Sequence, residues 1–421
     1  MTVGAHSPTT DWAGRPRVAV TGVGMKTPVG NDVESFWKGL LAARSAAAPI
    51  EAFDASPLGV RFACEVRDLE PEVYVEPKEA RRLDRTALLG LAAGLDAIAD
   101  AGEIGAEPAR SAVVAGTGIG GLQTFVDQQQ VYLEKGPERV SPFLVPMLMP
   151  NATAAHLSMR LGWTGPSLCV TTACAAGANS IGEGARLVRD GIADVVLAGG
   201  TEAPLTPVTM AAFWRMGALS TRNDEPERAS RPFDVDRDGF VMGEGAGFVT
   251  LERWDHATAR GARIYGEVVG YGANCDAHHI TAPDPQGAGA VACMRLALKD
   301  ANLDPDAIGH VNAHGTSTPM NDAIEAAAIR EVFGSPGPPV TSIKGVTGHL
   351  VGGAGAVETI AALLAARCGE VPPTGNHDTT DPEVTIDVVA GGVREIGVAP
   401  AVTNSFGFGG HNATLVVAPA P

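Results

Sequence analysis

Short, continuously apolar segments alternate with amphipathic or small-residue segments along nearly the whole chain. The pattern predicts strands over 17–22, 112–115 and 193–198, the first two ending in glycine turns, and helices over 33–41 and 78–101. Strands that are apolar on both faces are typical of a parallel sheet buried between helices. The pattern therefore predicts an α/β fold.

The same order of strands and glycine turns occurs twice along the chain. Each unit is a strand that leads into a glycine turn. The first three units lie at 113–121, 168–182 and 195–204, and their counterparts, in the same order, lie at 310–322, 340–356 and 402–417. We expect two copies of one α/β half, at 17–260 and 261–421, after a loose leader at 1–16. The turn at Cys174 would then mirror the turn at His349, with the helices that follow them packed back to back.

Composition and charge restrict the function. A chain of 421 residues with 45% hydrophobic residues is long enough to bury a large core. Its net charge of −17 argues against broad binding to nucleic acid or to an anionic membrane. An acidic partner would therefore have to dock on a local basic patch.

The cysteines and the N-terminus favour the cytoplasm. The 6 cysteines are scattered without a Cys-x-x-Cys pair, which fits a reducing compartment better than a disulfide framework or a zinc site. The first 17 residues contain no apolar signal-peptide core. The Ala-rich segment 354–366 is too short to span a bilayer and is expected to be a buried core helix.

Three motifs resemble cofactor or metal sites without meeting the requirements. Gly116-x-Gly118-x-x-Gly121 lacks the acidic residue that a dinucleotide site needs about twenty positions later. The acidic run that begins at Asp234 starts like a calcium loop, but Glu244 closes it at the eleventh position and no helices flank it. His278 and His279 have no further ligands at metal spacing. We therefore expect neither a cofactor nor a metal ion.

One cysteine lies where a strand turns into a helix. Cys174 follows the apolar segment before it and precedes small residues that open a helix, in the sequence V-T-T-A-C-A-A-G. The amides of a helix N-terminus carry partial positive charge, which is expected to lower the pKa of the thiol. A single cysteine is more often a small buried hydrophobic residue than a nucleophile.

Three further glycine turns each contain a polar group that a plain turn does not need. They are N-A-H-G-T-S-T-P at 312–319, S-I-K-G-V-T-G-H-L at 342–350, and N-S-F-G-F-G-G-H-N at 404–412. Each histidine alone is more often a hydrogen-bonded core or loop residue. Taken together with Cys174, the three turns indicate one catalytic site.

These four motifs closely resemble those of β-ketoacyl-acyl carrier protein synthases of the type II elongating kind. The resemblance extends from Val18 to Val417. It implies a thiolase-type fold, in which two βαβαβαββ halves pack into five layers (α-β-α-β-α), and normally a homodimer. The duplicated halves of this fold agree with the internal repeat.

The resemblance also implies roles for individual residues. Cys174 would hold the growing chain as a thioester, and its backbone N–H with that of Phe408 would form the oxyanion hole. His314 and His349 would stabilise the enolate that malonyl decarboxylation leaves. Lys344 would orient His314, with Glu325 as the charge partner of Lys344 in the same buried cluster.

Other positions match the substrate-binding residues of the family. Thr316 and Thr318 would bind the phosphopantetheine arm, and Thr281 and His279 would line the same tunnel. The acyl pocket would be lined by Ile119, Leu144 and Phe213. The size of Ile119 suggests medium or long acyl chains.

The family's carrier protein is acidic, and this chain has a matching basic cluster. The expected docking residues are Lys78, Arg81, Arg82 and Arg139. The chain departs from the family at Gly217, where related enzymes often have a basic residue that Arg215 would replace, and at Asn321, where glycine is common.

The leading hypothesis is an elongating synthase that condenses a cysteine-bound acyl chain with malonyl-carrier protein. The alternative is the catalytic subunit of a type II polyketide ketosynthase, paired with a chain-length factor. A non-catalytic partner subunit is disfavoured because Cys174 and both histidines are present. A thiolase would need a second cysteine where this chain has His411 and Asn412.

Overall fold

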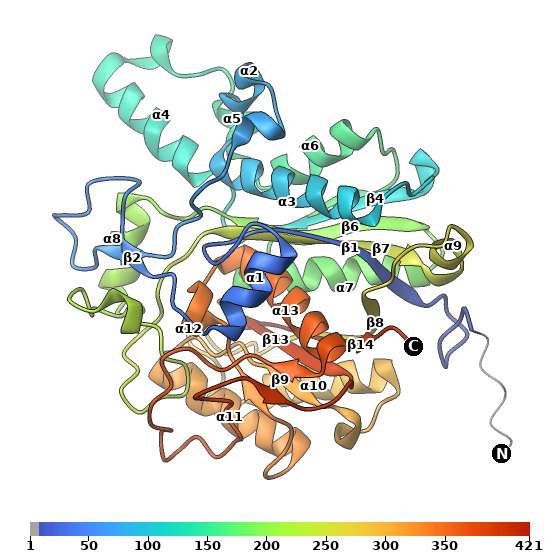
Figure 1. The fold of residues 1–421 in the computed structure, drawn as a ribbon. Coiled ribbons are helices and arrows are strands. Elements are labelled where there is room, and N and C mark those ends of the chain that lie inside the picture. The colour runs from blue at the N-terminus through green and yellow to red at the C-terminus, as the bar shows by residue number, and fades with distance from the viewer. Residues whose placement is uncertain (1–7) are drawn as a thin grey trace, which may run out of the picture.

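The computed structural model describes residues 8–421 and contains one large mixed sheet (Figure 1). Its 10 strands lie in the order β10-β9-β13-β14-β8-β1-β7-β6-β4-β5. They are β1 (Val18–Lys26), β4 (Ser111–Gly116), β5 (Ser167–Val170), β6 (Val195–Glu202), β7 (Gly245–Arg253), β8 (Gly266–Cys275), β9 (His310–Asn312), β10 (Val340–Thr341), β13 (Ala401–Gly407) and β14 (His411–Pro419). Two short pairs lie outside this sheet: β2 (Ala48–Pro49) with β3 (Phe62–Ala63), and β11 (Glu370–Val371) with β12 (Arg394–Glu395).

The strand order has an internal twofold pattern. Taken from the two edges inward, the halves are β5-β4-β6-β7-β1 and β10-β9-β13-β14-β8. In each half the three strands nearest the edge are parallel and the next two pairings are antiparallel. The halves meet where Ala19 and Val20 of β1 pair with Glu267 and Gly266 of β8. This topology is the predicted duplication.

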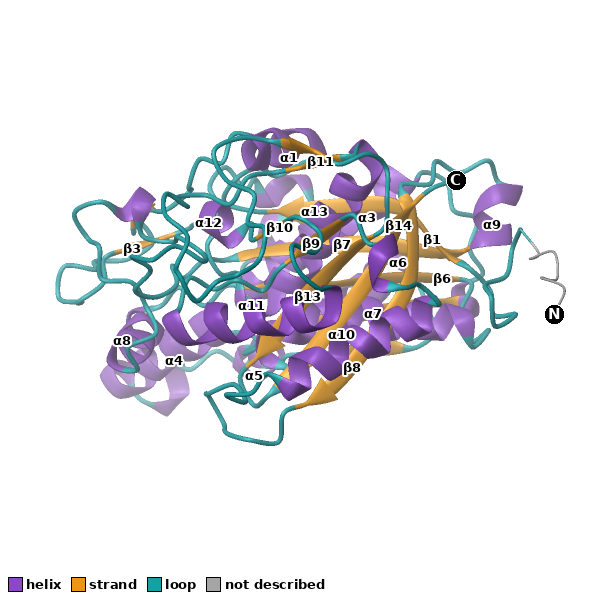
Figure 2. Ribbon diagram, turned by 90° about the horizontal axis from the view of Figure 1, so that it is seen from below, coloured by secondary structure: helices purple, strands orange, loops and turns teal. Residues whose placement is uncertain are grey.

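Helices lie on both faces of each half and between the halves. Figure 1 shows α3 (Arg85–Ala101) and α6 (Ala152–Leu161) above the sheet and α7 (Ala176–Arg189) and α13 (Ala354–Cys368) in the middle. On the opposite outer face, α10 (Ala288–Ala301) and α11 (Pro319–Phe333) lie side by side (Figure 2). The predicted five-layer α/β fold is confirmed.

The two central helices pack together through glycine and alanine. A β-carbon at Gly177 would lie 2.7 Å from the backbone nitrogen of Ala356, and one at Gly355 would lie 2.8 Å from that of Ala178. Larger side chains would push the helices apart. In the part of the chain described, Val351–Cys368 is apolar and long enough to cross a membrane, but 89% of this stretch is buried. The segment is a core helix, as predicted.

Further helices and 3-10 turns lie in the connections between these elements. They are α1 (Val33–Leu41), α2 (Pro77–Ala80), α4 (Leu122–Lys135), α5 (Leu144–Leu148), α8 (Pro207–Arg215), α9 (Trp254–Ala259) and α12 (Lys344–Thr347). The 3-10 turns are η1 (Pro71–Val73), η2 (Pro108–Arg110), η3 (Pro137–Arg139), η4 (Ala173–Ala175), η5 (Pro226–Arg228), η6 (Pro305–Ala307) and η7 (Val351–Gly353). The single helix predicted at 78–101 is wrong. The chain breaks before Asp84, whose buried carboxylate caps α3 at Thr86 and also binds Thr124 of α4.

The segment before β1 is held against the body of the protein. Arg15 pairs with Asp11 and with Asp300 of α10, and the Trp12 indole donates to the Asp300 carbonyl at 3.0 Å. The expectation of a loose leader at 1–16 is therefore wrong for residues 8–16, because these contacts to a distant helix leave no mark in the local sequence. The rest of that leader, residues 1–7, lies outside the described residues.

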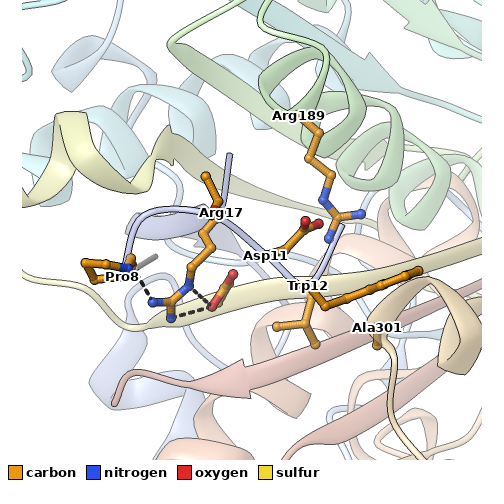
Figure 3. Close-up of a pocket in the computed structure, with 9 residues that line it drawn as sticks. Pro8, Asp11, Trp12, Arg17, Arg189 and Ala301 are labelled. Carbon is orange, nitrogen blue, oxygen red and sulfur yellow. Dashed lines mark hydrogen bonds and ion pairs between the residues drawn. The ribbon is translucent and has the colours of Figure 1, made fainter. Parts of the chain in front are cut away.

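A cavity of about 410 Å³ lies beside this segment (Figure 3). Its lining includes Trp12, Arg17 and Arg189. The cationic groups are already paired, since Arg17 binds Glu267 and Arg189 binds Asp300. Arg189 ends α7, about 20 Å along the helix from the turn that contains Cys174. The cavity is therefore remote from the predicted catalytic residues.

Candidate functional site

Cys174 lies in the tight turn between β5 and α7. The turn is η4, and Ala173 enters it with a left-handed φ of +49°. β13 ends directly against the turn, since a β-carbon at Gly407 would lie 2.7 Å from the Thr172 carbonyl oxygen and 3.1 Å from the Cys174 nitrogen. The next residue, Phe408, directs its backbone N–H at the Cys174 thiol. Of the two backbone N–H groups predicted for the oxyanion hole, that of Phe408 therefore approaches the sulfur.

The Cys174 thiol is protonated in this resting site. Burial raises the pKa of Cys174 to about 11, although Lys344 and the Phe408 N–H lower it. Glu202 and Glu358 add to the increase. The predicted lowering of the pKa is wrong, because the loss of water around the sulfur outweighs the lowering by Lys344 and the Phe408 N–H.

His349 contacts the nucleophile directly. Its Nε2 lies 3.2 Å from the Cys174 sulfur, and its Nδ1 accepts the N–H of Val351 at 3.2 Å. A neutral imidazole that accepts at Nδ1 carries its proton on Nε2, so this hydrogen bond assigns the tautomer. Burial and then Lys344 hold the pKa of His349 well below its ordinary value. The ring is a neutral donor that points at the sulfur.

His314 is the second imidazole of the site. Its ring centre lies 5.4 Å from that of His349, at an angle of 84°. The Lys344 ammonium lies 3.3 Å from His314 Nδ1, which leaves the proton on Nε2. Burial, Lys344 and His349, in that order, hold the pKa of His314 well below its ordinary value. The site thus contains two neutral N–H donors.

The charge partner of Lys344 differs from the prediction. Lys344 is buried, donates to the His314 carbonyl oxygen at 2.6 Å and forms an ion pair with Glu358 of α13. Glu325 instead accepts the backbone N–H groups of His314 at 2.8 Å and Gly315 at 2.7 Å. Burial raises the pKa of each of these two carboxylic acids to about 7. Glu325 therefore supports the histidine turn, but through the backbone.

The role of Glu358 was not predicted, although the sequence contains a signal for a buried charge at this position. It is the single charged residue in the apolar segment 354–366. A charge in a fully buried helix requires a partner of opposite sign, and the nearby motif supplies only Lys344. The apolar pattern led us to classify the whole segment as core.

Other groups near the site are apolar or unpaired. Phe240 lies 5.2 Å from the ring of His349, and Phe406 lies 5.9 Å from that of His314.

Within residues 8–421 no cluster of three or more His, Cys, Asp or Glu side chains is placed to hold a metal ion. Some buried oxygens lack a protein partner and can accept from water: Asn312 Oδ1, Glu358 Oε2 and Ser405 Oγ.

The predicted phosphopantetheine residues lie on two loops. The hydroxyls of Thr316 and Thr318 are 2.8 Å apart at the start of α11. His279 Nδ1 accepts the backbone N–H of Thr281 at 3.1 Å in the loop after β8. The carbonyl of the intervening residue, Ile280, accepts the N–H of Gly409 at 2.7 Å. The second loop is therefore tied to the loop that contains Phe408.

Residues predicted for the acyl pocket lie on three segments: the glycine loop after β4, α5 and α8. Phe213 of α8 stacks on Phe408 with ring centres 6.3 Å apart. Ile119 lies in the glycine loop, which contacts α5 through a hydrogen bond from Gly121 N–H to the Leu148 carbonyl at 3.1 Å. Leu144 is the first residue of that helix.

The predicted docking cations are exposed and unpaired. They are Lys78, Arg81, Arg82 and Arg139. Among the described residues, no carboxylate lies within ion-pair distance of any of them. The Arg82 guanidinium lies over the ring of Phe143, 4.3 Å from its centre. These four side chains are unpaired positive charges on a chain of net charge −17.

The structure gives a physical reason for the glycine at position 217 and shows what the side chain of Asn321 contacts. Gly217 has a left-handed φ of +73°, so a basic residue would be strained there. Arg215 is exposed two residues earlier, at the end of α8. Asn321 donates to Asp322 at 3.1 Å and to Glu325 at 3.5 Å. It therefore contacts the carboxylate that supports the His314 turn.

Comparison with known proteins identifies the family. The models of the beta-ketoacyl synthase N-terminal and C-terminal domains match residues 15–257 and 265–378. The 3-oxoacyl-[acyl-carrier-protein] synthase 2 of Synechocystis sp. is 48% identical over 95% of this chain and 97% of its own. That of Vibrio cholerae is 46% identical over 95% and 98%.

Solved structures agree with the sequence relatives. The ishigamide ketosynthase/chain length factor superposes with a TM-score of 0.92 at 37% identity, over 97% of this chain and 100% of that chain. A type II polyketide ketosynthase, solved in complex with its acyl-carrier protein, superposes with a TM-score of 0.87 at 30% identity, over 96% of this chain and 100% of that chain. The chain belongs to the beta-ketoacyl synthase family.

Proposed function

We propose that this chain is a 3-oxoacyl-acyl carrier protein synthase. It condenses an acyl chain held on Cys174 with malonyl-acyl carrier protein, lengthens the chain by two carbons and releases carbon dioxide. The observation that carries this proposal is the 3.2 Å approach of His349 Nε2 to the Cys174 sulfur, with His314 beside it as a second neutral donor. The full-length relationship to 3-oxoacyl-[acyl-carrier-protein] synthase 2 enzymes supports it.

The first half-reaction transfers the acyl group to Cys174. The sulfur attacks the carbonyl carbon of the acyl-carrier thioester, and the N–H groups of Cys174 and Phe408 stabilise the oxyanion. The bond to the phosphopantetheine sulfur breaks, and the proton of the Cys174 thiol passes to that leaving thiolate. Lys344 stabilises the negative charge on the attacking sulfur as the proton departs.

The second half-reaction uses the two histidines. Once Cys174 is acylated, its sulfur no longer accepts the His349 Nε2–H strongly, so both imidazoles are free to donate to the malonyl thioester oxygen. The bond to the malonyl carboxylate then breaks, carbon dioxide leaves, and the enolate attacks the acyl-cysteine carbonyl. The Cys174 thiolate departs and takes a proton from solvent. Neutral donors suit this step because an imidazolium would protonate the carbanion.

Product analysis with the purified protein tests this function. Incubation with an acyl-carrier protein should add the acyl mass to the peptide that contains Cys174. Adding malonyl-carrier protein should release carbon dioxide and yield the 3-oxoacyl product. Acylation of another residue, or decarboxylation without a condensation product, would contradict the proposal.

The partners of the chain follow from the same chemistry. We propose that the acyl carrier protein delivers both substrates on its phosphopantetheine arm, so that the enzyme needs no bound cofactor of its own. Six free cysteines fit a cytoplasmic location. A second chain is expected at β5, the edge strand of the sheet, where Leu168 is 44% exposed and Met159 of the adjacent α6 is 69% exposed.

The identity of that second chain separates the two candidate pathways. A homodimer that condenses unaided corresponds to an elongating fatty acid synthase enzyme. A polyketide ketosynthase would instead require a chain-length factor, as in the ishigamide ketosynthase/chain length factor structure. Native mass spectrometry of the purified chain, combined with the condensation assay, distinguishes them. A monomer that is inactive alone would favour the polyketide assignment.

Docking of the carrier protein is tested by charge reversal. The double change Arg81→Glu and Arg82→Glu should raise the KM for acyl-carrier protein about tenfold at low ionic strength and less at high salt, because the attraction is screened. The kcat should change little, since neither side chain touches the reacting atoms. Steady-state kinetics at two salt concentrations measure both quantities.

A matched control is available on the opposite outer layer. Arg295 and Lys299 are exposed on α10, and reversing both gives the same change in net charge, with the added loss of an exposed ion pair between Arg295 and Glu331. This variant should keep the wild-type KM within about twofold if the effect depends on docking at one site. Equal effects of the two double variants would show that overall charge, rather than the predicted docking residues, controls binding.

A further inference from the structure

Glu202, the last residue of β6, is a buried carboxylate that the mechanism above does not use. Its side chain is 0% exposed. One oxygen accepts the Thr117 hydroxyl at 2.8 Å and the Ile119 N–H at 3.2 Å, with the Gly120 N–H at 3.4 Å. The other accepts the N–H groups of Gly118 at 2.5 Å and Gly352 at 3.1 Å. One carboxylate therefore joins two loops far apart in sequence.

The two loops approach so closely that only glycine fits between them. A β-carbon at Gly352 would lie 2.4 Å from the Gly118 nitrogen and 2.7 Å from a Glu202 oxygen. A β-carbon at Gly118 would lie 2.8 Å from the same oxygen. The backbone groups directed at the carboxylate are all donors. A carboxylate offers an acceptor at both oxygen positions, whereas an amide would turn an NH₂ group toward the N–H and O–H donors at one of them.

Each loop leads directly to a different part of the site. The first, 117–120, contains Ile119, which we assign to the acyl pocket. The second leads to His349, because Val351 donates its N–H to His349 Nδ1 and Gly352 then donates to Glu202. Val351 has a left-handed φ of +47°, which is rare for a β-branched residue and persists only where its surroundings fix it. The hydrogen bond to Glu202 is one such constraint.

We propose that Glu202 is a positioning residue for both half-reactions. It fixes the 351–352 turn that sets the tautomer and direction of His349, and it fixes the 117–120 loop that places Ile119 in the acyl pocket. Glu202 itself touches no reacting atom and acts through backbone N–H groups of the two loops. This inference rests on the proposed function, since it assigns Glu202 to the acyl pocket and to the decarboxylation of that reaction.

The variant Glu202→Gln tests both effects. In a Cys174→Gln parent, which keeps both histidines but cannot condense, it should lower the kcat of malonyl decarboxylation about tenfold and change KM less than about twofold. In the protein with native Cys174, the ratio of kcat/KM between long and short acyl chains should shift about fivefold or more. If either quantity stays at the parent value in a folded variant, the proposal is wrong.

Glu252 provides the matched control. It is also a fully buried carboxylate, held by Thr21, His256 and Arg260, but it lies opposite Val195 at the start of β6. Seven residues of strand separate the two positions, about 23 Å. Glu252→Gln should lower the melting temperature, yet leave the decarboxylation kcat and the chain-length ratio within about twofold of the parent. A general effect of destabilisation would instead change both variants alike.

Further comparisons keep the test decisive. If Glu202→Gln does not fold, Glu202→Asp retains the charge but withdraws the carboxylate by one methylene, so it cannot reach both loops. It should give the same two changes. If the proposed function were wrong, the Cys174→Gln parent itself would not decarboxylate malonyl-carrier protein. An active parent that is unaffected by either Glu202 variant would refute the role of Glu202 alone.

Discussion

Cys174→Ala is expected to abolish both acyl-enzyme formation and condensation. The side chain that attacks the thioester is removed, while the turn, the oxyanion N–H groups and both histidines keep their positions. The loss should reach the detection limit of the assay, at least about a thousandfold, because no second nucleophile occupies the same place. Intact-protein mass spectrometry after incubation with acyl-carrier protein measures the first step directly.

Cys368→Ala is the control for this experiment. Cys368 is exposed at the end of α13, at the opposite end of that helix from the catalytic turn. This variant should acylate and condense like the wild type. Acyl labelling that persists in Cys174→Ala but disappears in another cysteine variant would move the nucleophile elsewhere.

Much of the fold could be predicted because it depends on local patterns that occur twice. Apolar strands that end in glycine turns gave the duplicated halves, and the strand order now shows the same arrangement in each. The repeat predicted that the helices after the Cys174 and His349 turns pack back to back, and the missing β-carbons of Gly177 and Gly355 allow this close contact. The family resemblance is confirmed by the two domain models and the full-length relatives.

The errors concern contacts between distant segments. The cap that Asp84 forms on α3 depends on its burial against α4, and the ordering of residues 8–16 depends on Asp300. The partner of Lys344 is Glu358 because α13 passes beneath the histidine turn. The contacts of Asp84 with Thr124 and of Arg15 with Asp300 have no fixed spacing in the sequence, so periodicity and motif searches do not find them. The partner of Lys344 is marked only by a lone charge in an apolar segment.

The Cys174 pKa shows the same limit for electrostatics. The helix N-terminus is visible in the sequence and favours the thiolate. Burial depends on every element packed around the sulfur and raises the pKa to about 11. The burial that sets the direction of the shift is therefore not visible in the local sequence.

The roles of the two histidines lead to the prediction with the second largest effect. Cys174→Gln should eliminate condensation and retain malonyl decarboxylation, because His314 and His349 still donate to the malonyl thioester oxygen. Adding His349→Ala to this parent should lower the kcat of decarboxylation about a hundredfold, the loss expected when one donor to a developing oxyanion is removed. Carbon dioxide release from malonyl-carrier protein measures both variants.

Comparing His349→Ala with Lys344→Ala distinguishes the catalytic role of the imidazoles from the structural role of Lys344. Removing His349 unpairs the Val351 N–H but leaves Lys344, Glu358 and the His314 turn paired as before, so the double variant should lose less thermal stability than one that breaks the ion pair. Lys344→Ala in the same parent would leave Glu358 buried without its cation and should lower the melting temperature as well as the rate. Decarboxylation that survives His349→Ala but fails in Lys344→Ala would assign enolate stabilisation to Lys344 and contradict the two-histidine mechanism.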